Sequence, residues 1–317
     1  MRDIDLGSLG GIAVFSTAQA ERHGISRRTL HDLVRRRRIT KVLHGWYTAM
    51  AVPDDETRHR LAAIAAVELY AGRGVASHHS ALVLHGLPLH QVDLRRVYLE
   101  RSDTAHGRAR SGVVLRAGRS LRTTATMEGW ATPVPTISVA DACILSGAVH
   151  GAPSGLVAAD AALRRGLCDA DQLTRAVERA KGYTGIEAIR AAVRFADGRH
   201  ESPGETLTAI ALRATGTPFE PQVDIWTRRG LTRVDFRNEE LKLIVEFDGL
   251  EKYGVARDAA AEPDAAQDAA AVVVAEKLRE DALRALGYRI ARIVWSDLFV
   301  EGRVHALIRQ ALAEDAA

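Results

Sequence analysis

The spacing of hydrophobic and polar residues over the first 50 positions predicts two short helices followed by a hairpin. Residues 16–24 begin with capping-type residues and end at Gly24, which is typical of a helix with both ends marked. A second helix is expected to begin at Ser26. Its apolar residues Leu30, Leu33 and Val34 form one inward-facing stripe. Two β-prone runs around His44-Gly45 then predict a hairpin, so the order is helix, turn, helix, hairpin.

Residues 57–195 predict a mostly helical region that contains a small sheet. Alanine-rich periodic segments indicate helices near 56–72, 153–166 and 169–182, and the runs "RRVYLE" and "SGVVLRAG" indicate strands. His78, His79 and His85 cluster in "SHHSALVLHGLP". A metal triad is one interpretation of this cluster, but no carboxylate stands at ligand spacing, and local hydrogen bonding or core packing is the favoured one.

The region 200–317 predicts an α/β domain with a mixed sheet. A helix opens at Ser202-Pro203, three strands follow as a meander, and a helix, a fourth strand and a last helix complete the order. Because the third and fourth strands are joined through a helix, we expect a mixed sheet covered by helices. The alanine- and acid-rich stretch at about 255–275 predicts a flexible insertion. The expected fold class is therefore multidomain α+β, with domains at 1–50, 57–195 and 200–317.

Charge is concentrated near the start of the chain. Residues 1–50 hold nine Lys/Arg against four Asp/Glu, although the whole chain carries a net charge of only +3. On the second helix the buried stripe leaves the basic residues facing solvent, where the first of them would reach DNA base edges and the later ones phosphates. The candidate DNA-binding residues are Arg27, Arg28, His31, Arg35, Arg36, Arg37, Arg38 and Lys41. A solvated helix whose last arginines complement the helix dipole is the alternative.

Two cysteines and the absence of a long apolar run set the expected compartment. Cys143 and Cys168 are far apart in sequence, so neither a disulfide framework nor a cysteine zinc site is expected. No apolar stretch is long enough for a membrane span, and the N-terminus has no secretory pattern. We expect a cytoplasmic protein.

The stretch "LIVEFDG" (243–249) ends a buried-type strand in two acids. Glu246 and Asp248 would share one face of this strand, and Asp235 ends the preceding strand in "VDF". If the turn between the strands sets the matching register, Asp235 and Glu246 face each other, and Glu205 can approach from its helix. Two carboxylates plus water suit Mg²⁺. The alternative is a strand that simply ends at an Asp-Gly turn.

Several segments of the C-terminal region resemble a known nuclease family. "ESPGE", "VDF", "IVEFDG", "EKYG" and "EKLREDALRALGYRIARIVWSDL" are similar, in this order, to the nuclease-like domain related to the very-short-patch repair endonuclease, within the PD-(D/E)XK superfamily. The resemblance covers about residues 200–300. It implies that Asp235 and Glu246 bind the metal and that Glu205 is the helix carboxylate. Lys252, Lys277 and Arg279 are candidates for a nearby cation. The superfamily expects lysine where this chain has Asp248, so either Lys277 or Lys252 takes that role or cleavage is weak or absent.

The N-terminal and middle regions resemble a second bacterial family. "GGIAVFSTAQAERHGISRRTLHDLVRRRRITKVLHGWYTA" is similar to the winged-helix domain of AbiEi-type antitoxins, and "VASHHSALVLHGLP" followed by "VYLERS" is similar to their middle region. Together the resemblances imply a double-stranded-DNA-binding protein with an endonuclease-like domain that uses Mg²⁺. The alternative is an antitoxin-like repressor, with a cognate toxin as partner and a degenerate nuclease fold. In a third interpretation the C-terminal region is purely structural.

Overall fold

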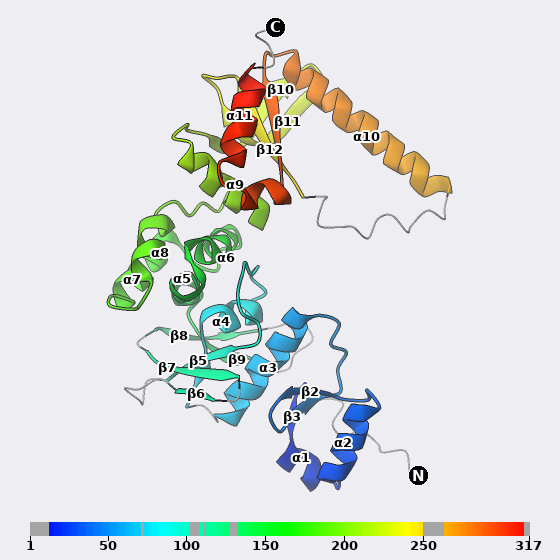
Figure 1. The fold of residues 1–317 in the computed structure, drawn as a ribbon, viewed down its shortest axis with the longest axis vertical. Coiled ribbons are helices and arrows are strands. Elements are labelled where there is room, and N and C mark those ends of the chain that lie inside the picture. Colours follow the sequence, from blue (N-terminus) through cyan, green and yellow to red (C-terminus); the bar gives the residue numbers. More distant parts are fainter. Residues whose placement is uncertain are drawn as a thin grey trace. The chain divides into compact units, whose positions relative to one another are not determined.

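A computed structural model describes residues 13–70, 73–101, 108–110, 112–118, 120–126, 132–249 and 263–313 (Figure 1). Contacts divide the chain into two compact units, Met1–Ala196 and Asp197–Ala317. The boundary falls between the predicted regions 57–195 and 200–317. The described residues form a mixed α/β structure with three sheets, which agrees with the expected multidomain α+β class at this coarse level. None of the described helices is long and apolar enough to cross a membrane.

Residues 15–48 contain the predicted helix pair and hairpin. Ser16 and Ser26 accept hydrogen bonds from backbone N–H groups in the first turn of each helix, as expected of capping residues. An additional short strand before the first helix pairs with the second hairpin strand, giving the sheet order β1-β3-β2. The elements are β1 (Phe15–Ser16), α1 (Thr17–Arg22), α2 (Arg27–Arg35), β2 (Thr40–Leu43) and β3 (Trp46–Thr48).

The middle of the first unit contains more strand than the sequence predicts. The expectation of a small sheet is wrong, because six strands form one sheet in the order β6-β7-β5-β4-β9-β8. Several of these strands are only two to four residues long, too short to show a periodic pattern. They are β4 (Val75–Ala76), β5 (Val97–Arg101), β6 (Arg108–Arg110), β7 (Val113–Ala117), β8 (Arg122–Ala125) and β9 (Val134–Ile137).

Helices cover this sheet and form a bundle after it. The core of the sheet is buried against the apolar residues of the first of these helices, and Val14 and Trp46 join the same hydrophobic cluster. The N-terminal region and the middle region therefore belong to one unit. The helices are α3 (Asp55–Leu69), α4 (His78–Leu84), α5 (Val139–His150), α6 (Ala152–Arg164), α7 (Ala170–Arg179) and α8 (Ile186–Val193).

The second unit is a four-stranded mixed sheet covered by helices, as predicted. The strand order is β10-β11-β12-β13, with antiparallel pairs except for the parallel pair of β12 and β13. Residues of α9 and α11 pack on one cluster of strand residues, and Leu283 of α10 packs on another. The elements are α9 (Pro203–Ala214), β10 (Glu220–Thr227), β11 (Gly230–Asn238), β12 (Leu243–Asp248), α10 (Pro263–Arg284), β13 (Arg289–Val294), a 3₁₀ turn η3 (Trp295–Phe299) and α11 (Arg303–Ala313).

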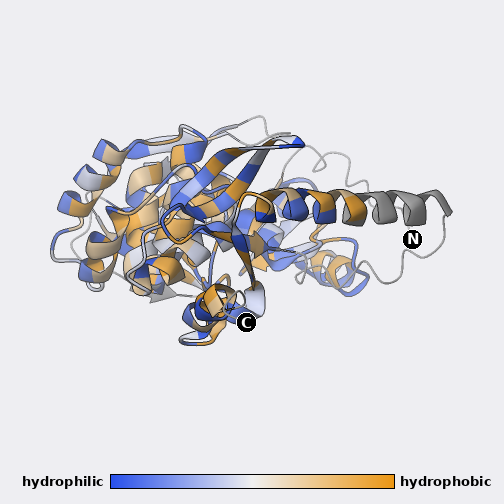
Figure 2. Ribbon diagram, turned by 90° about the horizontal axis from the view of Figure 1, so that it is seen from above, coloured by the Kyte–Doolittle hydropathy of each residue, from blue (hydrophilic) through white to orange (hydrophobic). Residues whose placement is uncertain are grey.

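The helix α10 begins earlier than the sequence predicts. The flexible insertion was expected at about 255–275, but from Pro263 onward the chain is helical. Proline suits a first helical turn, and the alanines that follow have the highest helix propensity of any residue type. The earlier part of the predicted insertion lies outside the described residues. Figure 2 shows apolar and polar residues alternating along the described end of α10, the part that packs on the sheet.

Candidate functional site

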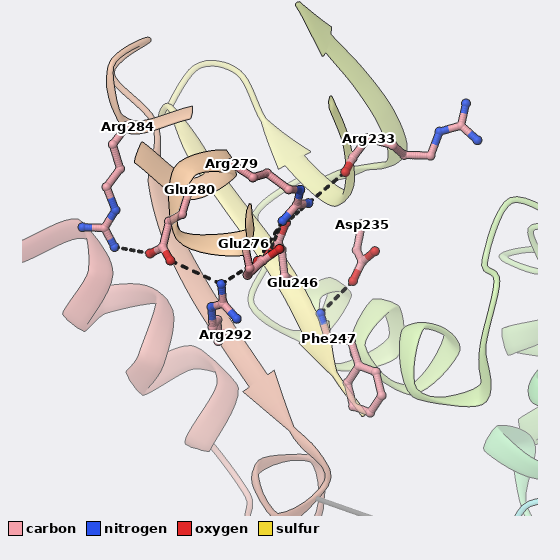
Figure 3. A network of polar contacts seen from close by, with 9 residues as sticks. All are labelled: Arg233, Asp235, Glu246, Phe247, Glu276, Arg279, Glu280, Arg284 and Arg292. Atoms are coloured by element: carbon pink, nitrogen blue, oxygen red, sulfur yellow. Dashed lines mark hydrogen bonds and ion pairs between the residues drawn. The ribbon is translucent and has the colours of Figure 1, made fainter. Parts of the chain in front are cut away.

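The candidate site lies where strands β11 and β12 separate. Their ladder pairs Phe236 with Val245 and Arg237 with Ile244, and continuing this register by one residue places Asp235 opposite Glu246. One carboxylate oxygen of Asp235 accepts a hydrogen bond of 2.8 Å from the backbone N–H of Phe247 (Figure 3). The side chain of Asp235 thus takes the place of a ladder partner at this point.

The strand β11 is irregular at Asp235. Val234 packs in the cluster that contains Leu283 of α10, whereas Phe236 packs in the cluster that contains α9 and α11, although regular alternation would put both on one face. Across the sheet, Gln222 lies opposite Asp235 by the register of its neighbours and has a φ of 55°, in the left-handed region. Such backbone is strained for a residue other than glycine and concentrates at functional sites.

Helix α9 brings a third carboxylate to the site. Glu205 is 6% exposed, and its oxygens accept hydrogen bonds from the Gln222 side chain at 2.7 Å, the Ser202 hydroxyl at 2.9 Å and the Glu201 N–H at 2.8 Å. The close approach of α9 to β12 depends on Gly204, which precedes Glu205 in this helix. A Cβ on Gly204 would lie 1.9 Å from the ring of Phe247, so α9 could not pack this close to β12 with any other residue there.

The three acids affect one another electrostatically. The pKa of Asp235 is raised to about 6, mainly by burial and additionally by the nearby carboxylates of Glu205 and Glu246, while the Phe247 N–H and Arg279 act in the opposite direction. The carboxylates of Glu205 and Glu246 therefore lie close enough to Asp235 to raise its pKa. Among the described residues, however, no three His, Cys, Asp or Glu side chains are arranged to hold a metal ion on their own.

The cation at the site is Arg279, from α10. Its guanidinium donates to both carboxylate oxygens of Glu246, at 2.5 and 3.3 Å, and also to the backbone oxygen of Arg233 (Figure 3). The Glu246 side chain is only 12% exposed, so this ion pair is largely shielded from water. Glu276 accepts from both Arg279 and Arg292, which extends the network along α10 and β13.

The remaining predicted site residues lie around this centre or outside the described residues. Asp248 ends β12 and is partly exposed, opposite Val294 of β13. Lys277 is exposed on α10, and the contact with Glu246 is made by Arg279 instead. Lys252 lies outside the described residues. Gln222 was missed, because a glutamine within a strand gives no sequence signal of a left-handed backbone or of a contact with Glu205.

The predicted DNA-binding residues are all exposed, and five of them line one hollow of the first unit. The two helix residues Arg27 and Arg35 are paired with acids, Glu21 at 3.0 Å and Asp32 at 2.5 Å. A hollow between α2 and the hairpin is lined by Arg27, Arg28, His31, Asp32, Val34, Arg35, Lys41 and Tyr47. All eight candidates are exposed: Arg27, Arg28, His31, Arg35, Arg36, Arg37, Arg38 and Lys41.

The predicted histidine cluster is hydrogen-bonded, with His78 and His79 buried and His85 partly buried, as the favoured interpretation expected. His79 must donate through Nε2 to the Arg96 carbonyl at 3.0 Å, so its Nδ1 accepts from His150. His78 contacts the Tyr183 hydroxyl at 2.9 Å, and His85 contacts Thr136. Burial lowers the pKa of His78 to about 3 and that of His79 to about 2. These rings are neutral parts of the core.

Comparison with known proteins gives relatives but no family. No family model matches the chain. Two curated proteins of Mycobacterium tuberculosis are similar to it: "Uncharacterized protein MT2308" of strain CDC 1551 / Oshkosh and "Uncharacterized protein Rv2248" of strain H37Rv. Each is 32% identical over 163 residues, an alignment that covers 50% of this chain and 55% of the relative. The chain thus spans about half the length of the curated relatives it matches, and their names state no activity.

Proposed function

We propose that this chain is a DNA-binding protein whose second unit is a Mg²⁺-dependent endonuclease of the PD-(D/E)XK type. The observation that carries the proposal is the position of Asp235 opposite Glu246, at the point where two strands separate, with Glu205 close by. A strand that merely ended at an Asp-Gly turn would not need three carboxylates together at partly buried positions.

The residues at the site fit a divalent cation. Asp235 has one oxygen engaged with the Phe247 N–H, and within the described residues its other oxygen has no hydrogen-bond donor. Its pKa is raised by burial and, to a smaller extent, by the charges of Glu205 and Glu246, and a bound cation would offset these effects by favouring the ionised carboxylate. Asp235 and Glu246 would hold Mg²⁺ with water completing its shell. The ion would supply an activated water and neutralise charge on the phosphodiester.

Arg279 takes the part that lysine plays in the superfamily pattern. Asp248 cannot provide a positive charge, whereas the guanidinium of Arg279 forms an ion pair with Glu246. From there it holds the carboxylate in one orientation and adds a fixed positive charge beside the phosphate that would be cleaved. Gln222 and Ser202 in turn hold Glu205.

The first unit would bind the DNA. The proposal assigns α2 to the major groove of double-stranded DNA, with Arg28 and His31 directed to base edges and Arg37, Arg38 and Lys41 to phosphates. All five are exposed. The hairpin β2–β3 would act as the wing of a winged helix.

A cleavage assay tests the enzymatic half of the proposal. Full-length protein with Mg²⁺ is incubated with linear, nicked, mismatched and single-stranded DNA, and compared with Asp235→Asn and Glu246→Gln. Glu239→Gln, which changes an exposed acid in the turn between the same two strands, is the matched control. We expect cleavage by the wild type and by the control only. Equal product from wild type and Asp235→Asn on every substrate would refute nuclease activity.

The alternative function is a non-catalytic, antitoxin-like repressor with a cognate toxin as partner. Two observations favour it: the ion pair with Arg279 already neutralises Glu246, and Asp248 stands where the superfamily pattern expects lysine. Calorimetric titration with Mg²⁺ and Mn²⁺ separates the two functions. Heat of binding that is lost in Glu246→Ala supports the nuclease, and identical traces for both proteins support the repressor.

A further inference from the structure

The hairpin formed by β10 and β11 exposes an aromatic residue at its outer end. Trp226 is 75% exposed and lies opposite Leu231, which is 53% exposed. Their neighbours Ile225 and Val234 are buried in the core. The indole therefore contributes little to the packing of the second unit, and burying a tryptophan on a partner would be strongly favourable.

Two arginines follow the tryptophan in the turn. Arg228 and Arg229 are exposed, and the turn is fixed because the Thr227 hydroxyl donates to the Gly230 carbonyl and accepts from the Arg229 N–H. Asp224, the acid nearest the tip on these two strands, is engaged with Arg233 through two contacts of 2.8 Å. No carboxylate within the described residues forms an ion pair with Arg228 or Arg229, so the hairpin tip carries two uncompensated positive charges beside an exposed indole.

The hairpin tip belongs to the same strands as the carboxylate site. Leu231 is four residues from Asp235 on β11, which corresponds to about 13 Å along the strand. Gln222, which contacts Glu205, lies four residues from Trp226 on β10. A polynucleotide with one phosphate at Asp235 would therefore reach the tip within a few nucleotides.

We infer that this hairpin tip binds an unpaired nucleotide of DNA, with the base stacked on Trp226 and the flanking phosphates on Arg228 and Arg229. Base stacking on an exposed aromatic side chain combined with cationic contacts to the backbone is the usual mode of single-strand binding. The inference rests on the proposed function for its DNA substrate but does not require cleavage. It adds a substrate class: DNA with unpaired or unstacked bases near the cleavage position.

Binding without cleavage tests this inference. Full-length protein carrying Arg28→Ala and Arg38→Ala, which weakens the contribution of α2, is titrated in EDTA with a fluorescent single-stranded oligonucleotide. We expect Trp226→Ala to reduce affinity roughly five- to tenfold and Trp226→Phe to keep most of it. Phe299→Ala, which removes an aromatic residue that is 58% exposed in η3, is the matched control and should bind as the parent does.

Two further measurements test Arg228 and Arg229 and the contact between Trp226 and a base. Arg228→Ala with Arg229→Ala should lower the slope of log affinity against log salt by about 1.4 for a single strand. Irradiation of an oligonucleotide containing 5-iododeoxyuridine should cross-link the peptide that contains Trp226. Unchanged affinity in Trp226→Ala, or cross-links confined to α2 and the β2–β3 hairpin, would overturn the inference.

The outcomes also distinguish this inference from the proposed function. If Trp226 cross-links to DNA and no variant or substrate shows cleavage, the nuclease proposal fails and the hairpin contact stands. If cleavage depends on Asp235 but Trp226→Ala changes neither binding nor cleavage of single-stranded substrates, the nuclease proposal stands and the hairpin contact is refuted. Absence of any single-strand binding refutes the hairpin contact directly.

Discussion

Arg279 and Glu246 form a two-point ion pair between α10 and the end of β12. The guanidinium contacts both carboxylate oxygens, and the Arg279 and Glu246 side chains are 29% and 12% exposed. A carboxylate that is so well shielded from water is costly unless a cation compensates it. Removing Arg279 would therefore leave the Glu246 charge without compensation at the candidate site.

Removing the arginine should destabilise the second unit and change its response to metal. We expect Arg279→Ala to lower the free energy of unfolding by about 2 kcal/mol, because Glu246 is left partly buried without its cation. Mg²⁺ should restore part of this loss by taking the place of the guanidinium. Urea denaturation with and without Mg²⁺ measures both effects. Arg284→Ala, which breaks an exposed pair with Glu280, should change little; equal losses in the two variants would contradict the assignment.

Asp235 should give the second unit an unusual pH dependence. Its pKa is about 6 in the folded protein and near 3.8 when unfolded, so the folded state binds a proton more tightly and stability falls as pH rises from about 4 to 6. Relative to Asp235→Asn, the wild type should lose on the order of 2 to 3 kcal/mol over this window. Denaturation of both proteins at several pH values gives the difference.

Metal should reverse this trend, because Mg²⁺ binds only the ionised carboxylate. Above pH 6, Mg²⁺ should stabilise the wild type and leave Asp235→Asn unaffected. A difference between the two proteins that stays constant from pH 4 to pH 7 would show that the Asp235 carboxyl is not perturbed by its neighbours.

The buried histidines should give the first unit the opposite pH dependence. Burial lowers the pKa of His59 to about 4, that of His78 to about 3 and that of His79 to about 2. The unfolded chain therefore binds protons more readily, and stability should fall as pH drops from about 6.5 through 4. Thermal unfolding followed by circular dichroism should show a shallower pH dependence for His79→Leu than for the wild type. Parallel curves would mean that His79 does not remain neutral in the fold.

The exposed arginines of α2 and of the segment that follows it should govern binding to duplex DNA. Each phosphate contact that is lost should reduce the slope of log affinity against log salt by about 0.9, so Arg37→Ala and Arg38→Ala together should reduce it by about 1.8. Arg28→Ala should weaken binding to the preferred DNA sequence more than binding to other sequences. Fluorescence anisotropy with duplexes at several salt concentrations measures this, with Arg73→Ala as an exposed arginine outside α2 and the hairpin. Equal effects of Arg73 and Arg38 would indicate non-specific attraction only.

The sequence by itself determined those features that depend on neighbouring residues. The caps at Ser16, Ser26 and Ser202 follow from short-range hydrogen bonding, and the helices that they start were predicted correctly. The mixed sheet of the second unit also followed from local order, because a strand, a helix and a strand in succession favour a parallel pair. The short strands of the six-stranded sheet were missed, since they form through partners far along the chain.

Only the tertiary structure decided the geometry of the candidate site. Local pattern left open whether Asp235 would face Glu246, because a register slip of one residue would have separated them, and strand register is set by long-range pairing. The choice of Arg279 over Lys277 depended on which face of α10 packs on the sheet. Gln222 joined the site through a left-handed backbone that its residue type does not signal. Residue type and spacing were enough to predict which acids are candidates. Packing across the sheet decided which of these acids lie close together and that Arg279 is the cation that contacts Glu246.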